Sequence, residues 1–496
     1  MADIVLTGDT SGAITVAAPA VAGTNTLTLP ATTGTVTITS TGGVDSNTGL
    51  GDGTFDANTT GANNVAVGKD ALRANTTASN NTAIGTKAGY SNTTGTSNVA
   101  VGREALYSNT NASFNTAVGM QSLTSNTTGA SNTAVGEAAL DANTTGGSNV
   151  AVGRDALGAN TTGSFNHAFG RNALLTNTTG QYNNAFGNDA LKVNTADGNS
   201  AFGHAALVAN TTGLYNTAVG YQALNSNTTA TFNVAVGYNA LRDNTGAENT
   251  ASGYQALRNN TTGAYNTALG RNALVLNTTA SSNTAVGNHA MYANTTGANN
   301  VALGYQALKT NTTSSYNTAV GRDALYNATG GSNTALGRNA ANNLTTGSNN
   351  TALGYTATPS SATVSNEFTL GNNNVTNLRC ADTTISALSD ARDKTNIQDI
   401  PLGLDFINQM RPVSFDWDRR DGTYKGKKDF GFIAQELKEI QDNTAYANHM
   451  RLVHEDNPEK LEADPMKTYP VLVKAIQELS AKVEELQTEI NTLKGN

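Results

Sequence analysis

The chain has 496 residues, with 50 Gly, 8 Pro, one Cys, one Trp and a formal net charge of −8 at pH 7. A single cysteine excludes a disulfide framework within the chain and a thiolate zinc site, and it fits synthesis in a reducing cytoplasm. The acidic balance argues against a nucleic-acid partner, since the one basic cluster is the short run from Lys425 to Lys428. We find no secretory leader pattern after Met1 and no apolar stretch long enough for a membrane span, so we expect neither export nor membrane insertion.

Prolines and charged residues are unevenly distributed and divide the chain into two regions that meet near residue 385. No proline lies between Pro30 and Pro359. From Ser386 onward 35 of 111 residues are charged, whereas the preceding 385 residues contain only 31 charged ones. The sequence therefore predicts a long, sparsely charged region followed by a smaller, highly charged module.

The N-terminal residues 1–50 alternate between apolar and small polar residues, as in the stretches 12–16 and 26–30. Such alternation between turns rich in Gly, Ala and Pro predicts a small β segment. Residues 13–36 also resemble the start of phage tail fibre proteins, and that resemblance implies attachment to the virion through this end.

A repeat of 17 residues fills residues 51–357. Its marker glycine recurs eighteen times, with a spacing of 17 residues and three spacings of 16. The residue two before this glycine is Ala in every unit, and the residue four before it is Asn in every unit. The marker glycines are residues 68, 85, 102, 119, 136, 153, 170, 187, 203, 220, 237, 253, 270, 287, 304, 321, 337 and 354.

Each unit is too short for a pair of packed helices, and its Thr-Thr-Gly corner would end helices repeatedly. A short Thr-Ala-Val strand, a glycine turn, an Ala-Leu pair and an Asn/Thr/Gly corner instead predict one coil of a β-solenoid. With coils about 4.8 Å apart, eighteen coils give a rod on the order of 85 Å long. We expect the fold class to be mostly β, with this solenoid as a stalk and an α+β module after it.

The repeated positions predict how a coil is built. We expect the residue before the glycine and the Leu four after it to form a narrow core, with the Asn in left-handed corners and in amide ladders. Because that core is thin, we also expect several chains to share an axis and to bury their Ala faces against one another. Aromatic residues at equivalent positions predict columns along the rod, either for stability or as a stripe that contacts sugar or protein.

The units, for example Asn80 to Gly85, resemble the head repeats of trimeric YadA-like adhesins, although the period here is longer. That resemblance implies a parallel β-roll in a homotrimer. The three histidines of the repeats, His167, His204 and His289, occupy different positions of the unit, so we expect no metal site and no cofactor.

Residues 358–388 form a connector, in which residues 366–377 predict a strand, and the charged module occupies residues 389–496. Several motifs of this module resemble, in order, the intramolecular chaperone or peptidase S74 domain at the end of phage tail spikes and fibres. The motifs are residues 389–397 (SDARDKTNI), 411–415 (RPVSF), 429–436 (DFGFIAQE) and 475–479 (AIQEL). The family's module trimerises the fibre, guides folding of the stalk and is released by self-cleavage.

The same resemblance implies a catalytic pair of Ser389 and Lys394, with cleavage at one of the two bonds within Leu388-Ser389-Asp390. The chemistry requires a hydroxyl made nucleophilic by a neutral amine, so Lys394 needs desolvation or a neighbouring cation. Arg392 either supplies that cation or orients Asp390.

The last segment, residues 469–494, predicts a coiled-coil helix. Its apolar residues alternate spacings of four and three, which is a heptad seam. The seam consists of Leu472, Ile476, Leu479, Val483, Leu486, Ile490 and Leu493. The a and d residues alone favour a two-stranded coil, whereas the family resemblance implies three strands, and we expect the trimer.

These observations predict a homotrimeric tail fibre for attachment to a host cell, assembled in the host cytoplasm and located in the virion. We expect as partners a tail or baseplate protein at the N-terminus and a host surface receptor such as a glycan. The alternatives are a cellular trimeric surface adhesin, for which we find neither leader nor membrane anchor, and a protease acting in trans.

Overall fold

The computed structural model describes residues 4–7, 13–16, 46–375, 389–419, 425–455 and 461–495. Near the N-terminus, β1 (Ile4–Thr7) and β2 (Ala13–Val16) pair antiparallel as a hairpin, in agreement with the predicted β segment. The predicted strand at residues 26–30 lies outside the described residues.

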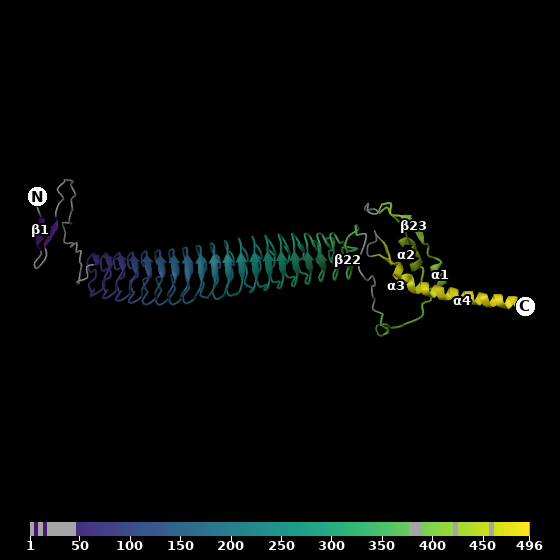
Figure 1. Ribbon diagram of the computed structural model, residues 1–496, viewed down its shortest axis with the longest axis horizontal. Coiled ribbons are helices and arrows are strands. Elements are labelled where there is room, and N and C mark those ends of the chain that lie inside the picture. The colour runs from purple at the N-terminus through teal and green to yellow at the C-terminus, as the bar shows by residue number, and fades with distance from the viewer. Residues whose placement is uncertain are drawn as a thin grey trace.

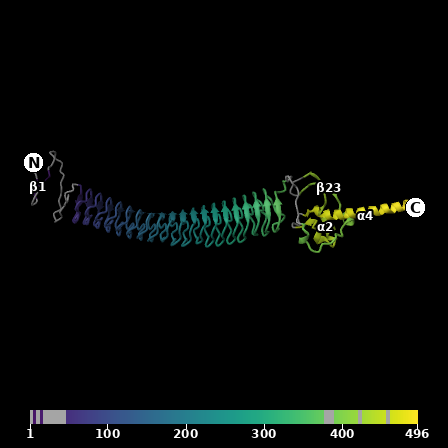
Figure 2. The same ribbon diagram turned by 60° about the horizontal axis from the view of Figure 1, so that its bottom comes forward.

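The middle of the chain is a stack of parallel strands, each of which pairs with the next one along the chain, from β3 to β22. Figure 1 shows the strands in one line along a rod, and Figure 2 shows the same rod from another side. The strands are β3 (Thr48–Leu50), β4 (Val65–Val67), β5 (Thr82–Ile84), β6 (Val99–Val101), β7 (Thr116–Val118), β8 (Thr133–Val135), β9 (Val150–Val152), β10 (His167–Phe169), β11 (Asn184–Phe186), β12 (Ser200–Phe202), β13 (Thr217–Val219), β14 (Val234–Val236), β15 (Thr250–Ser252), β16 (Thr267–Leu269), β17 (Thr284–Val286), β18 (Val301–Leu303), β19 (Thr318–Val320), β20 (Thr334–Leu336), β21 (Thr351–Leu353) and β22 (Phe368–Leu370). We call residues 46–375 the stalk.

The stalk confirms the predicted parallel β-solenoid of 17-residue coils. Strands pair in strict register, so that Ala134 of β8 faces Ala151 of β9. Backbone hydrogen bonds also join the coils outside the strands, as from Leu140 N to the Ala156 carbonyl at 3.0 Å. The sheet runs past the expected stalk limits at residues 51 and 357, because β3 and β22 add a strand at each end.

The core of the stalk lies inside each single chain. The Ala two before each marker glycine, for example Ala134 and Ala218, is fully buried, and so is the Leu four after it, such as Leu140. The expectation that several chains bury their Ala faces together is therefore wrong, since the coil itself already encloses these methyl groups.

A second correction concerns the residue before the glycine, which was expected in the core. Val135 and Val219 are 37% and 38% exposed. Side chains alternate between the two faces of a strand, so an inward Ala forces its neighbour outward. Only the Leu of the predicted pair of core residues faces inward.

Of the two uniform positions, the marker glycine adopts a positive φ angle and the repeated Asn does not. Gly136 has φ +136°, and a Cβ there would lie 2.6 Å from the Gly153 carbonyl oxygen of the next coil, so only glycine fits. Positive φ angles occur at the residue before the repeated Asn and at the second and fourth residues after the glycine, such as Ser131, Ala138 and Leu140. The expectation of left-handed backbone at the Asn itself is wrong.

The predicted amide ladders are present, and there are two of them. In one, Asn132 Oδ1 accepts the Asn149 backbone N–H at 3.0 Å, while Asn149 Nδ2 donates to the Gly163 carbonyl at 2.9 Å. In the other, Asn143 Nδ2 donates to Asn126 Oδ1 at 2.8 Å. Each amide thus satisfies buried polar groups of a neighbouring coil.

The C-terminal module, residues 389–495 as described, is a small α+β unit beyond the last coil (Figure 1). A cluster of buried apolar side chains from α1, α2, α3, β25 and α4 holds it together. Its elements are η1 (Ala391–Asp393), α1 (Leu404–Ile407), β23 (Val413–Asp416), β24 (Lys428–Gly431), α2 (Ala434–Asp442), α3 (Ala447–Met450), β25 (Val453–His454), β26 (Glu462–Ala463), η2 (Pro465–Thr468) and α4 (Tyr469–Lys494). Within the described parts of the chain, no helix has both the length and the apolar character needed to cross a bilayer.

The buried Ala column yields a first prediction. Ala218 lies between Ala201 and Ala235 in register, so Ala218→Leu overpacks the coil and lowers the stability of each chain by about 1 to 3 kcal/mol. Thermal unfolding followed by circular dichroism measures the effect. The control Thr229→Leu, at an exposed corner, should leave the melting temperature nearly unchanged. Equal melting temperatures for the two variants would contradict an inward Ala218.

Candidate functional site

The candidate site is a tight turn at the start of the C-terminal module. The Asp390 side chain caps the short helix η1, because its Oδ1 accepts the Arg392 backbone N–H at 2.9 Å. The Lys394 backbone N–H then donates to the Ala391 carbonyl at 3.2 Å, which reverses the chain. This turn carries Lys394 back to the first residue of the module.

The turn brings Ser389 and Lys394 together. Lys394 Nζ lies 2.6 Å from Ser389 Oγ and 3.3 Å from the Ser389 carbonyl oxygen. The expected pair thus has the hydrogen-bond geometry of a nucleophile and its base. Both residues are exposed in the single chain.

Arg392 pairs with the carboxylate of Asp390. Its Nε lies 3.0 Å from Asp390 Oδ1 and 3.1 Å from Oδ2. Of the two roles expected for Arg392, the geometry places its guanidinium where it orients Asp390. Leu388, on the other side of the candidate cleavage position, lies outside the described residues.

The helix α4 begins inside the module and leaves it. Val471 and Ala475 are buried, and Glu478 Oε2 accepts the Leu404 backbone N–H at 2.8 Å, which fixes the first turns of α4 to α1. Beyond Glu478 the residues of the helix are exposed, and it extends away from the module (Figures 1 and 2). The heptad residues Leu472, Ile476, Leu479, Val483, Leu486, Ile490 and Leu493 are all exposed.

A comparison with models of known protein families bears on the C-terminal module. Residues 389–446 match the family model Peptidase_S74, chaperone of endosialidase. This confirms the family to which the C-terminal module was assigned. With the solenoid stalk before it, the match fits a phage tail fibre or tail spike with a C-terminal chaperone. No curated protein and no solved structure matches the chain.

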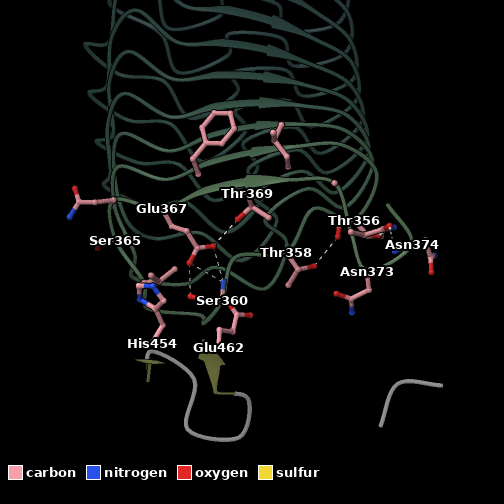
Figure 3. A pocket seen from close by; sticks show the side chains of 16 residues that line it. Thr356, Thr358, Ser360, Ser365, Glu367, Thr369, Asn373, Asn374, His454 and Glu462 are labelled. Atoms are coloured by element: carbon pink, nitrogen blue, oxygen red, sulfur yellow. Dashed lines mark hydrogen bonds between the residues drawn. The ribbon is translucent and has the colours of Figure 1, made fainter. Parts of the chain in front are cut away.

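A second feature lies at the end of the stalk that faces the module. An open cavity of about 810 Å³ lies between the last coil of the stalk and the hairpin β25–β26. Figure 3 shows His454 and Glu462 on the side of that hairpin. Its central acid, Glu367, accepts hydrogen bonds from the Ser360 backbone N–H at 3.0 Å and from Thr369 Oγ1 at 2.7 Å. These bonds tie β22 to the loop before it, so Glu367 has a structural role there.

Some of the aromatic residues stack as predicted. After the marker glycines, Tyr221, Tyr238 and Tyr254 stack with their ring centroids 5.3 Å apart at each step. Before the repeated Asn, Phe165 and Tyr182 stack at 5.2 Å. Stacked rings add contacts between coils, whereas Phe114, Tyr265 and Tyr316 remain 61% to 65% exposed.

The pairing of Asp390 with Arg392 yields a prediction about protonation. The Arg392 guanidinium, followed by the Arg392 backbone N–H, holds the pKa of the Asp390 carboxyl below its ordinary value. The pairing therefore persists above the ordinary pKa of an aspartate and is lost as the pH falls through the lowered pKa. In an uncut Ser389→Ala chain, Arg392→Ala should raise the pKa of Asp390 toward about 3.9.

Nuclear magnetic resonance of ¹³C-labelled aspartate carboxyls, assigned with Asp390→Asn, measures this pKa. Arg411→Ala serves as control, because Arg411 pairs with Glu436 instead. If Arg392→Ala left the pKa of Asp390 unchanged, the ion pair would not exist in solution.

Proposed function

We propose that the chain is a homotrimeric phage tail fibre or spike whose C-terminal module assembles the stalk and is then cut off at Ser389. The observation that carries this proposal is the family match at residues 389–446, directly after a long repeat stalk and around a Ser389–Lys394 contact of 2.6 Å. The virion is the proposed location, with the N-terminal segment on the tail and the distal end toward a host receptor.

The exposed half of α4 supports self-association. Most of the stability of a helix in a protein comes from packing of its apolar face, and the seven seam residues of α4 stay exposed in the single chain. Packing against the same seam of other copies would bury those residues and stabilise the helix. We therefore assign the coiled coil at residues 469–494 to the trimer contact.

The contact between Ser389 and Lys394 supports self-cleavage. Lys394 Nζ is placed to take the proton of Ser389 Oγ as that oxygen attacks a carbonyl carbon. Attack on the preceding carbonyl, that of Leu388, closes a five-membered ring; the peptide bond between Leu388 and Ser389 then breaks, the Ser389 nitrogen takes the proton from Lys394, and water hydrolyses the resulting ester to separate the two pieces. Attack of Ser389 on its own carbonyl would close a strained ring of four. Within one chain ring size therefore favours the bond between Leu388 and Ser389. A cut after Ser389 would instead require Ser389 of another copy or a water molecule activated by Lys394.

The third prediction tests the pair. The full chain expressed in bacteria should split into a large N-terminal fragment and a C-terminal one that begins at Ser389 or Asp390, and intact-mass spectrometry should read which. Ser389→Ala and Lys394→Ala should each leave the chain whole, because each removes one partner of the proton transfer. Lys425→Ala, a change on an exposed loop, is the control and should be cut normally. Efficient cleavage of both dyad variants would refute the assignment.

The fourth prediction tests the chaperone role. A chain that ends at Leu388 lacks the one segment with a distinctive sequence, so its coils have no fixed register and it should aggregate or misassemble. The uncut Ser389→Ala chain, and the stalk left after cleavage of the natural chain, should be soluble trimers by light scattering. A truncated chain that forms the same trimer would show that the module is dispensable for assembly.

A further inference from the structure

The outer face of the stalk sheet is an uncharged band with one apolar column. It consists of the two outward residues of each strand, which are the residue before the marker glycine and the residue three before it. Across the eighteen units neither position is Asp, Glu, Lys or Arg, and the residue before the glycine is apolar in all units except at Ser252. The charged residues of the units lie at other positions, for example at Arg103, Glu104 and Asp141.

Side chains of this band stand in solvent in the single chain. The residues before the glycine remain exposed from one end of the stalk to the other, at 36% to 52% of their surface in the most open cases. Examples are Ile84, Val135, Phe169, Val219, Leu269 and Leu336. The opposite face of the same sheet is the buried Ala column. A parallel sheet is normally covered on both faces, and here the outer face is uncovered.

The two columns of the band differ in composition. The residue three before the glycine is Val in five units and a polar residue, mostly Thr, in the other thirteen. In three consecutive coils, with His167, Asn184 and Ser200 in this column, the residue before the glycine is Phe, and the three phenyl rings stack at 4.5 Å and 4.8 Å. The apolar surface of the band therefore comes mainly from the residues before the glycine.

We propose that copies of this chain pack in parallel with these bands turned toward one another. Each coil contributes the same two positions to the band along the whole stalk. A partner that covers the band must therefore match the length of the stalk and the spacing of its coils. Another copy of the stalk in the same register meets both conditions. The exposed seam of α4 joins copies in parallel beyond the same end of the rod. An uncharged apolar surface of this length is otherwise rare on a soluble monomer.

This inference deepens the proposed function, since it names the surface through which the homotrimer holds its stalk. It also replaces the expected Ala contact. The Ala column closes each coil internally, and the band joins the copies. The inward Ala of each strand thus stabilises the single chain, and the outward residues of the same strand join the copies.

Cross-linking of the full chain tests the proposal. The background chain carries Cys380→Ser, which removes the only native thiol, and Ser389→Ala, which keeps it uncut. Single cysteines replace Thr217 or Val219, the two band residues of β13, or Tyr221, which follows Gly220 at the edge of the band. Treatment with a short bis-maleimide should convert most chains of at least one of these variants into covalent dimers.

Two controls make the result decisive. Thr229→Cys, at an exposed corner away from the sheet, should give no covalent dimer. Val483→Cys, in the seam of α4, reports association through the helix. If Val483→Cys cross-links and none of the three band variants does, the copies join through α4 alone; the stalk proposal is then overturned while the trimer stands. If light scattering shows a monomer, both proposals fail.

Discussion

The structure and the stability of the stalk depend on the close approach of successive coils. The buried Ala and Leu side chains of a coil pack against those of its neighbours in one continuous core, and many of its backbone amides and buried Asn side chains find partners on the coils above and below. At the marker glycine the approach is so tight that a methyl group would strike the next carbonyl. The stalk also holds three residues per coil, including the buried Leu140 and its equivalents, in left-handed backbone, which is costly for residues other than glycine. The contacts between coils must offset that cost, and so a single coil is not a stable unit.

The same regularity creates a problem at the level of assembly. A slip of one unit keeps glycine against glycine and Asn against Asn, so the repeats do not distinguish correct pairing from shifted pairing between copies. The C-terminal module has none of this symmetry. Its core is made from different elements, and Glu478 on α4 anchors the helix to α1 at one defined position. In the proposed function, the module fixes where copies begin to pair, and the stalk then assembles from that end.

Much of the fold could be predicted because the same residue types recur at the same positions of every repeat. Uniform Ala and Asn positions require equivalent backbone sites, which led to the solenoid and to the amide ladders. The direction of the residue before the glycine was mistaken because composition suggested a thin core shared among chains, whereas strand alternation sends Ala134 inward and Val135 outward. Left-handed backbone at Phe165 and Leu157 could not be read from residue preference, since closure of the coil overrides local propensity. At the candidate site, spacing alone could not show that Asp390 caps the turn that joins Ser389 to Lys394.

The exposure of this pair bears on the order of events in the proposed function. A lysine acts as a base only when its amine is neutral, and burial favours the neutral form. Lys394 and Ser389 are exposed in the single chain, and Arg392 is committed to Asp390. In the proposed function, a monomer therefore holds Ser389 and Lys394 in contact but exposed, and association of copies is the step that buries them. A cut that waits for association would keep the module attached until register is set, which is the order that a stalk of near-identical coils requires.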